Sequence, residues 1–137
     1  MLTGVVITIP SHPHGFNVIE AVKQAWIHMR FEAPIMATTI ESTAIDSQVR
    51  YTLKYIVPSI PDIAAWSDKT IHHVPFSLGA DEFRAQVAGE RHHLIAGEGN
   101  FASRLYLGED EGGNDQYHLY YAAHHAVTDV RGSFAVC

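Results

Sequence analysis

The residues best suited to acid–base chemistry are His124, His125 and Asp129, in the stretch "HHAVTD". A histidine has a pKa close to neutral, so His125 could act as a general base, with Asp129 folded back beside its imidazole. The same spacing fits a structural histidine–aspartate pair. A zinc site is a third interpretation, although no spaced ligand set such as HExxH or CxxC lies nearby. Spacing alone leaves these three interpretations open.

Two further pairs of adjacent histidines occur, at His72–His73 and His92–His93. Neighbouring side chains on a strand point to opposite faces, so such a pair offers one imidazole to each side and cannot easily share one metal ion. We therefore interpret both pairs as polar residues at the edges of secondary-structure elements.

Motifs for covalent catalysis and for phosphate binding are missing. The sequence has no GxSxG elbow, and its single cysteine is Cys137, at the free end, where a rigid site is hard to maintain. The glycine-rich "GEGN" at residues 97–100 lacks the GxxxxGK[ST] spacing of a phosphate loop. Neither a covalent nucleophile nor a nucleotide site is predicted.

The elements that must position these residues follow from apolar periodicity. We predict strands at residues 4–10, 35–41 and 48–57, a short helix at 62–66, a short strand at 70–76 and a helix at 80–93. The last third is predicted to form a hairpin around the turn-rich "EGGND", with Tyr117, Leu119 and Tyr121 on one face of its second strand. This order favours an α/β (α+β) layered domain with a mixed sheet and flanking helices.

The clearest helix signal begins at Asn17. Asn17 can cap the helix, Glu20 can complete a capping box, and Pro34 should end the helix because it disfavours helical geometry at Ala33. In the helix at 80–93, Phe83 and Val87 are expected to face inward. The apolar stripe of the first helix consists of Val18, Val22, Ala25, Trp26 and Met29.

Composition excludes several classes of protein. The 137 residues suit one domain, and no window approaches the roughly 18 apolar residues of a membrane helix. A net charge of -6 with only nine scattered Lys and Arg residues argues against a nucleic-acid partner. A single cysteine allows no internal disulfide, and the start of the chain lacks a basic signal region, so we expect a cytoplasmic protein.

"HHAVTD" resembles the HHxxxD core of the HHxxxDG signature of the chloramphenicol-acetyltransferase-like superfamily. That group includes condensation domains of peptide synthetases, plant-type BAHD acyltransferases and fungal trichothecene-type O-acetyltransferases. Upstream, "VIEAVKQAWIHMRFEAPIMATTI" resembles the first helix of this group and the segment that follows it, and "AAWSDKTIHHVP" resembles the fungal branch. The resemblance covers most of the chain in order.

The resemblance implies one half of a two-subdomain acyltransferase fold, with residues 1–137 as the N-terminal subdomain. His125 would be the general base that deprotonates a hydroxyl or amine of a small molecule as it attacks an acyl thioester. His124 would support the motif loop, and Asp129 would pair with an arginine. An acyl-CoA or carrier-protein thioester would be the co-substrate, and no metal or tightly bound cofactor is implied. A second polypeptide would complete the fold.

Two departures from the family pattern stand out. Val130 replaces the glycine expected after the aspartate, and a left-handed backbone there would be costly for a β-branched residue. The DFGWG-like element of the second subdomain is missing. Two alternatives to acyl transfer therefore stay open: a biosynthetic cyclase or pericyclase on the same fold, and a non-catalytic interaction fragment.

Overall fold

A computed structural model of the chain describes residues 2–8, 15–74, 80–90, 101–109, 116–124 and 127. Its main sheet has four strands in the order β1-β6-β5-β4, namely Leu2–Thr8, Gln116–Ala123, Ser103–Glu109 and Ile71–His73. β6 pairs antiparallel with both β1 and β5, whereas β4 pairs parallel with β5. The sheet is therefore mixed, as the sequence predicted.

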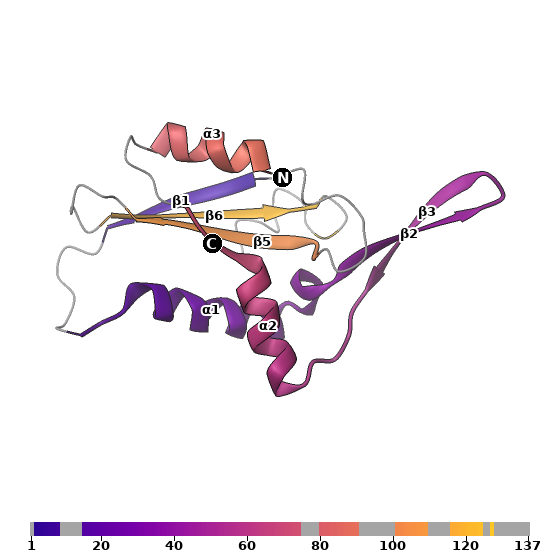
Figure 1. Cartoon of the computed structure of the whole chain (residues 1–137), viewed down its shortest axis with the longest axis horizontal. Coiled ribbons are helices and arrows are strands. Elements are labelled where there is room, and N and C mark those ends of the chain that lie inside the picture. Colours follow the sequence, from indigo (N-terminus) through magenta and orange to yellow (C-terminus); the bar gives the residue numbers. More distant parts are fainter. Residues whose placement is uncertain are drawn as a thin grey trace.

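Helices cover both faces of this sheet (Figure 1). α1 (Val18–Glu32) and α2 (Ile60–Thr70) lie on one face, and α3 (Ala80–Glu90) lies on the other. The predicted layered fold with flanking helices is confirmed. Within the described ranges, no helix is long and apolar enough to cross a membrane.

The strand β6 carries large side chains on both of its faces. Tyr117 and Tyr121 pack towards α1 and α2, as predicted for one face of this strand. Tyr120 packs on the opposite side against Phe83 of α3, with ring centroids 5.1 Å apart. A strand between two helical layers is buried on both sides, which explains why its sequence has few polar residues between the apolar ones.

The centre of the core is a pair of tryptophans from α1 and α2. The rings of Trp26 and Trp66 stack with centroids 5.4 Å apart and planes 8° apart. Trp26 Nε1 donates a hydrogen bond to Thr70 Oγ1 at 2.9 Å, and that hydroxyl donates to the Trp66 carbonyl at 2.7 Å. The Tyr121 ring meets the Trp26 ring edge-on, with ring centroids 6.1 Å apart. The tryptophan stack therefore packs both helices against the middle of the sheet.

The start of α1 follows the sequence signals, with one correction. The Asn17 side chain accepts a hydrogen bond from the backbone N–H of Glu20, as predicted for a cap. The Glu20 carboxylate does not complete a capping box, because it accepts a hydrogen bond from Gln24 Nε2 at 2.7 Å. The helix ends at Glu32, before Pro34, as expected.

Several predicted boundaries were wrong. The strand predicted from residue 35 begins only at Thr39, because Pro34–Ala37 forms a 3₁₀ turn closed by a hydrogen bond from Thr38 Oγ1 to the Ile35 carbonyl. The predicted short helix is the longer α2. Phe83 of α3 is fully buried as predicted, whereas the Val87 side chain and residues 91–93 lie outside the described part.

β2 (Thr39–Ile45) and β3 (Gln48–Lys54) form a separate two-stranded antiparallel sheet. β3 is shorter than the predicted strand at 48–57. Asp46 and Ser47 link the two strands with positive φ angles of 51° and 63°, which are typical of a two-residue type I′ turn. This hairpin projects away from the main sheet (Figure 1).

Candidate functional site

The motif "HHAVTD" begins where β6 ends. His124 directly follows the strand, is half-buried, and donates its backbone N–H to the Ala102 carbonyl at 2.9 Å. Val127 donates its backbone N–H to the His124 carbonyl at 3.0 Å and packs into the core that holds Trp26 and Trp66. His125 and Asp129 lie outside the described residues, so their predicted roles stay predictions.

The described histidine pair of β4 separates as expected for neighbours on a strand. His72 stacks on Tyr106, with centroids 5.1 Å apart, and its Nε2 lies 3.3 Å from Nη1 of Arg104. His73 is exposed and lines a small pocket described below. In the ranges that the structure describes, no group of three or more His, Cys, Asp or Glu side chains could hold a metal ion.

Sequence reasoning missed Arg30, which the structure buries against Trp66 of α2. Arg30 is only 4% exposed, and its guanidinium lies 4.8 Å from the Trp66 ring centre and 5.9 Å from that of Tyr55. A signal was available: Arg30 follows Trp26 by four residues, and residues with this spacing share one helix face. The burial of Arg30 was not predicted, because charged residues usually lie on the exposed face of a helix.

Several buried nitrogen atoms around Arg30 are donors that find no acceptor among the described residues. Nε and Nη1 of Arg30 and Nε1 of Trp66 are buried, and the described residues provide no hydrogen-bond partner for them. An unmade hydrogen bond of a buried donor costs about 1–3 kcal/mol, and more for a charged group. The arrangement therefore calls for an acceptor, and a carboxylate fits best because it can accept two parallel hydrogen bonds from a guanidinium.

A pocket of about 410 Å³ opens beside these donors, between α1, α2 and the base of the hairpin. Its charged residues carry both signs, and the Glu41–Lys54 ion pair of 3.0 Å forms part of the wall. Hydrogen bonds from Ser59 Oγ and N hold the pKa of Asp62 below its ordinary value, and the charge of Arg30 adds to this. The lining residues are Arg30, Ala37, Thr39, Glu41, Lys54, Ile56, Pro58, Asp62, Ala65, Trp66, Lys69 and Phe101.

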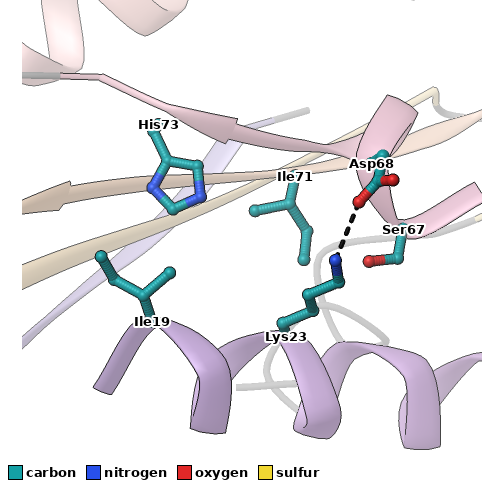
Figure 2. Close-up of a pocket in the computed structure, with 6 residues that line it drawn as sticks. All are labelled: Ile19, Lys23, Ser67, Asp68, Ile71 and His73. Carbon is teal, nitrogen blue, oxygen red and sulfur yellow. Dashed lines mark hydrogen bonds and ion pairs between the residues drawn. The ribbon is translucent and has the colours of Figure 1, made fainter. Parts of the chain in front are cut away.

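A smaller pocket of about 140 Å³ lies between α1, α2 and β4 (Figure 2). Lys23 of α1 and Asp68 of α2 close one side with an ion pair of 2.8 Å, which raises the pKa of Lys23. Ser67 is fully buried, and its Oγ has no hydrogen-bond partner among the described residues. Ile71 lies between Ser67 and His73 in Figure 2, so these side chains do not form a nucleophile–base pair.

No family model and no curated protein sequence matches this chain. Solved structures do. The chain superposes on the trichothecene 15-O-acetyltransferase of Fusarium sporotrichioides with a TM-score of 0.69 and 19% identity. It is also similar to a structure of condensation domain-mediated chain release from the enacyloxin polyketide synthase, with a TM-score of 0.50 and 15% identity. A third similar structure is the wax ester synthase/diacylglycerol acyltransferase of Marinobacter aquaeolei VT8, with a TM-score of 0.50 and 14% identity.

Each superposition covers 98% of this chain but only a minor part of the other protein. The covered shares are 28% of the acetyltransferase, 24% of the condensation-domain protein and 31% of the wax ester synthase. At these identities the likeness concerns the fold. The chain therefore has the chloramphenicol-acetyltransferase-like fold that the motif predicted, and spans about a quarter to a third of the length of the proteins it superposes on.

Proposed function

We propose that this chain supplies the general base of an acyltransferase, which moves an acyl group from a thioester to a hydroxyl or amine of a small molecule. The observation that carries the proposal is the position of "HHAVTD": it directly follows β6, an inner strand of a sheet whose fold is shared with acyltransferases. An acyl-CoA or a carrier-protein thioester is the proposed donor, without a tightly bound cofactor.

The proposed chemistry needs one base. His125 takes the proton of the acceptor hydroxyl or amine as its oxygen or nitrogen forms a bond to the thioester carbonyl carbon. The carbon–sulfur bond then breaks, and the proton passes from the imidazolium to the leaving thiolate, so that an ester or amide and a free thiol result. A positioned base contributes roughly 10²–10⁴-fold to such a step.

Asp129 is the proposed acceptor for the orphaned donors of Arg30. Val127, two residues before Asp129 in the sequence, packs in the same core as Trp66, over which the Arg30 guanidinium lies. A carboxylate there would accept from the guanidinium fork and remove the penalty of a buried unpaired charge. The pair would hold the motif loop against α1 and keep His125 in place, with His124 as a supporting residue.

A second subdomain or a second polypeptide is proposed to complete the fold; the superposition covers 28% of the acetyltransferase. The complete assembly is then the form in which activity is measured. The chain by itself should turn over poorly, since a substrate site built between two subdomains needs both walls.

The test of the base is thiol release from acyl-CoA by the assembly purified from the native host through a tag on this chain. His125→Ala should lower turnover by roughly 10²-fold or more. His28→Ala is the matched control, because His28 is an exposed histidine of α1 whose Nε2 lies 3.6 Å from Glu32 Oε1. Full transfer by His125→Ala would overturn the assignment. Product formation without free CoA would favour the cyclase.

The Arg30–Asp129 pair is tested by a double-mutant cycle on stability. Arg30→Met and Asp129→Asn should each destabilise the chain, and the double variant should be no worse than the worse single one. A coupling of about 1–3 kcal/mol is expected for a shared buried hydrogen bond. Additive losses would show that the two side chains do not interact.

A further inference from the structure

The hydrogen bond that holds the backbone of His124 belongs to a short series of backbone contacts. The Ala102 carbonyl accepts from His124 N at 2.9 Å, and Ala102 N donates to the Thr38 carbonyl at 2.8 Å. The main chain bends at Ala102, so that its N–H and its carbonyl serve different segments. Thr38, which directly follows the 3₁₀ turn, is therefore connected to the start of the motif through a single residue.

This series lies in the protein interior. Thr38 is 6% exposed and Ala102 is 1% exposed, and Ala102 packs in the same core as Val127. An isolated bridge between Thr39 and Phe101 pairs the neighbouring residues of the same two segments. Because a buried backbone group that loses its partner is not readily satisfied by water, the series holds the turn and the start of the motif at a fixed separation.

The Thr38 side chain holds the turn from which this series begins. Its Oγ1 donates to the Ile35 carbonyl at 2.7 Å, and Thr38 N donates to the same carbonyl at 3.2 Å. Two donors from one residue thus close the turn, and Thr38 itself is extended, with a φ of -76° and a ψ of 151°. In this conformation the Thr38 carbonyl accepts the hydrogen bond from Ala102.

The precision of these contacts matters because the motif begins at His124. A general base acts only within hydrogen-bond reach of the proton that it takes, and a displacement of about 1 Å can lower a rate by about 10²-fold. A shift of Ala102 would move the His124 backbone, and with it the point from which the chain continues to His125. The turn before β2 is thereby coupled to the position of the motif.

We propose that Thr38 is a positioning residue for the base: its hydroxyl holds the 3₁₀ turn, and its carbonyl holds the Ala102 backbone to which His124 is bonded. The inference rests on the proposed function and adds to it a residue outside the motif, between α1 and β2. Thr38 acts through Ala102 and His124 rather than on the substrate.

The experiment compares two substitutions of Thr38 in the assembly used for thiol release. Thr38→Val removes the hydroxyl and keeps the branched shape, which suits the extended backbone at this position. It should lower kcat about tenfold and leave KM for acyl-CoA within about twofold. Hydrogen exchange at the His124 amide should become about tenfold faster, because local opening of its bond costs less. Thr38→Ser keeps the donor and should restore both values.

Thr70→Val is the matched control. Thr70 is a fully buried threonine beside the two core tryptophans, and its Oγ1 donates to the Trp66 carbonyl at 2.7 Å, the same distance as in the Thr38 bond. The hydrogen bonds of this hydroxyl join α1 and α2 and do not involve the motif. Thr70→Val should therefore destabilise the fold but leave kcat within about twofold and exchange at His124 unchanged.

Three results would overturn the inference: equal losses of kcat in Thr38→Val and Thr70→Val, a loss that Thr38→Ser does not restore, or unchanged exchange at His124 in Thr38→Val. Thr38→Ala takes the place of the valine variant if the latter does not assemble.

The exchange measurement does not depend on catalysis, so it separates this inference from the proposed function. Full transfer by His125→Ala together with faster exchange at His124 in Thr38→Val would refute the base and leave the anchoring of His124 by Thr38 intact. Loss of transfer in His125→Ala, with kcat and exchange unchanged in Thr38→Val, would refute the positioning role alone.

Discussion

Strand β6 of the main sheet and strand β3 of the hairpin both carry large apolar or aromatic side chains but differ in what covers them. On β6, Tyr120 packs against α3 while Tyr121 packs against the tryptophans of α1 and α2. On β3, all seven residues are exposed, although Val49, Tyr51 and Leu53 share one apolar face. Periodicity therefore says which side chains share a face. Whether a second layer covers that face depends on elements distant in sequence or on another polypeptide.

The largest effect that tests this comparison is expected from Trp66. Trp66 is 2% exposed and stacks on Trp26, so Trp66→Ala should lower the free energy of unfolding by about 3–5 kcal/mol. Tyr51→Ala, on the uncovered face, should change it by no more than about 0.5 kcal/mol in the isolated chain. Urea denaturation followed by far-UV circular dichroism measures both. Trp66→Phe, a milder change, keeps the comparison measurable if the alanine variant fails to fold.

A large loss from Tyr51→Ala in the isolated chain would contradict this picture. It would mean that the apolar face of the hairpin is already covered within the chain, and the contrast between the two regions would disappear.

A smaller effect is expected at the tip of the hairpin. Ser47 has a φ of 63°, a left-handed conformation that glycine adopts without strain. Ser47→Gly should therefore stabilise the hairpin by up to about 1 kcal/mol. Hydrogen exchange should slow at the paired amides of β2 and β3 and stay unchanged in β5 and β6. Equal slowing in both sheets would show that hairpin and main sheet open as one unit.

The smallest effect is expected where the chain leaves the hairpin and enters α2. Hydrogen bonds from Ser59 lower the pKa of Asp62 below 3.8, so the ionised carboxylate stabilises the folded state. This stabilisation is complete above the unfolded pKa and is lost as the pH falls through the lower, folded pKa. Asp62→Asn should lower the melting temperature slightly at neutral pH and make no difference in strong acid. A difference that persists in strong acid would assign the effect to something other than this charge.

The elements whose signals lie close together in sequence were predictable. Asn17 and Pro34 bound α1, and the alternation on either side of "EGGND" predicted the pairing of β5 with β6. The 3₁₀ turn at Pro34–Ala37 was missed, because its apolar residues read equally well as a strand. The predicted capping box at Asn17 does not form. The Glu20 carboxylate accepts a hydrogen bond from Gln24 instead.

The candidate site was predictable only in part. His124, His125 and Asp129 were predicted from their spacing and from a family resemblance. The fold that this resemblance implied is confirmed, whereas the roles of these residues stay predictions. Arg30 was not predicted, because its spacing from Trp26 shows only a shared helix face and not that a tryptophan from a second helix lies under its guanidinium.

The sequence by itself determined the local elements: where α1 begins and ends, and which residues of β6 share a face. Caps, proline and periodicity act over a few residues, so they can be read without knowing the fold. Only the tertiary structure decided the strand order β1-β6-β5-β4, the burial of Arg30 over Trp66 and the exposure of Tyr51. These features depend on which apolar faces meet, and that is settled by packing between segments far apart in the chain.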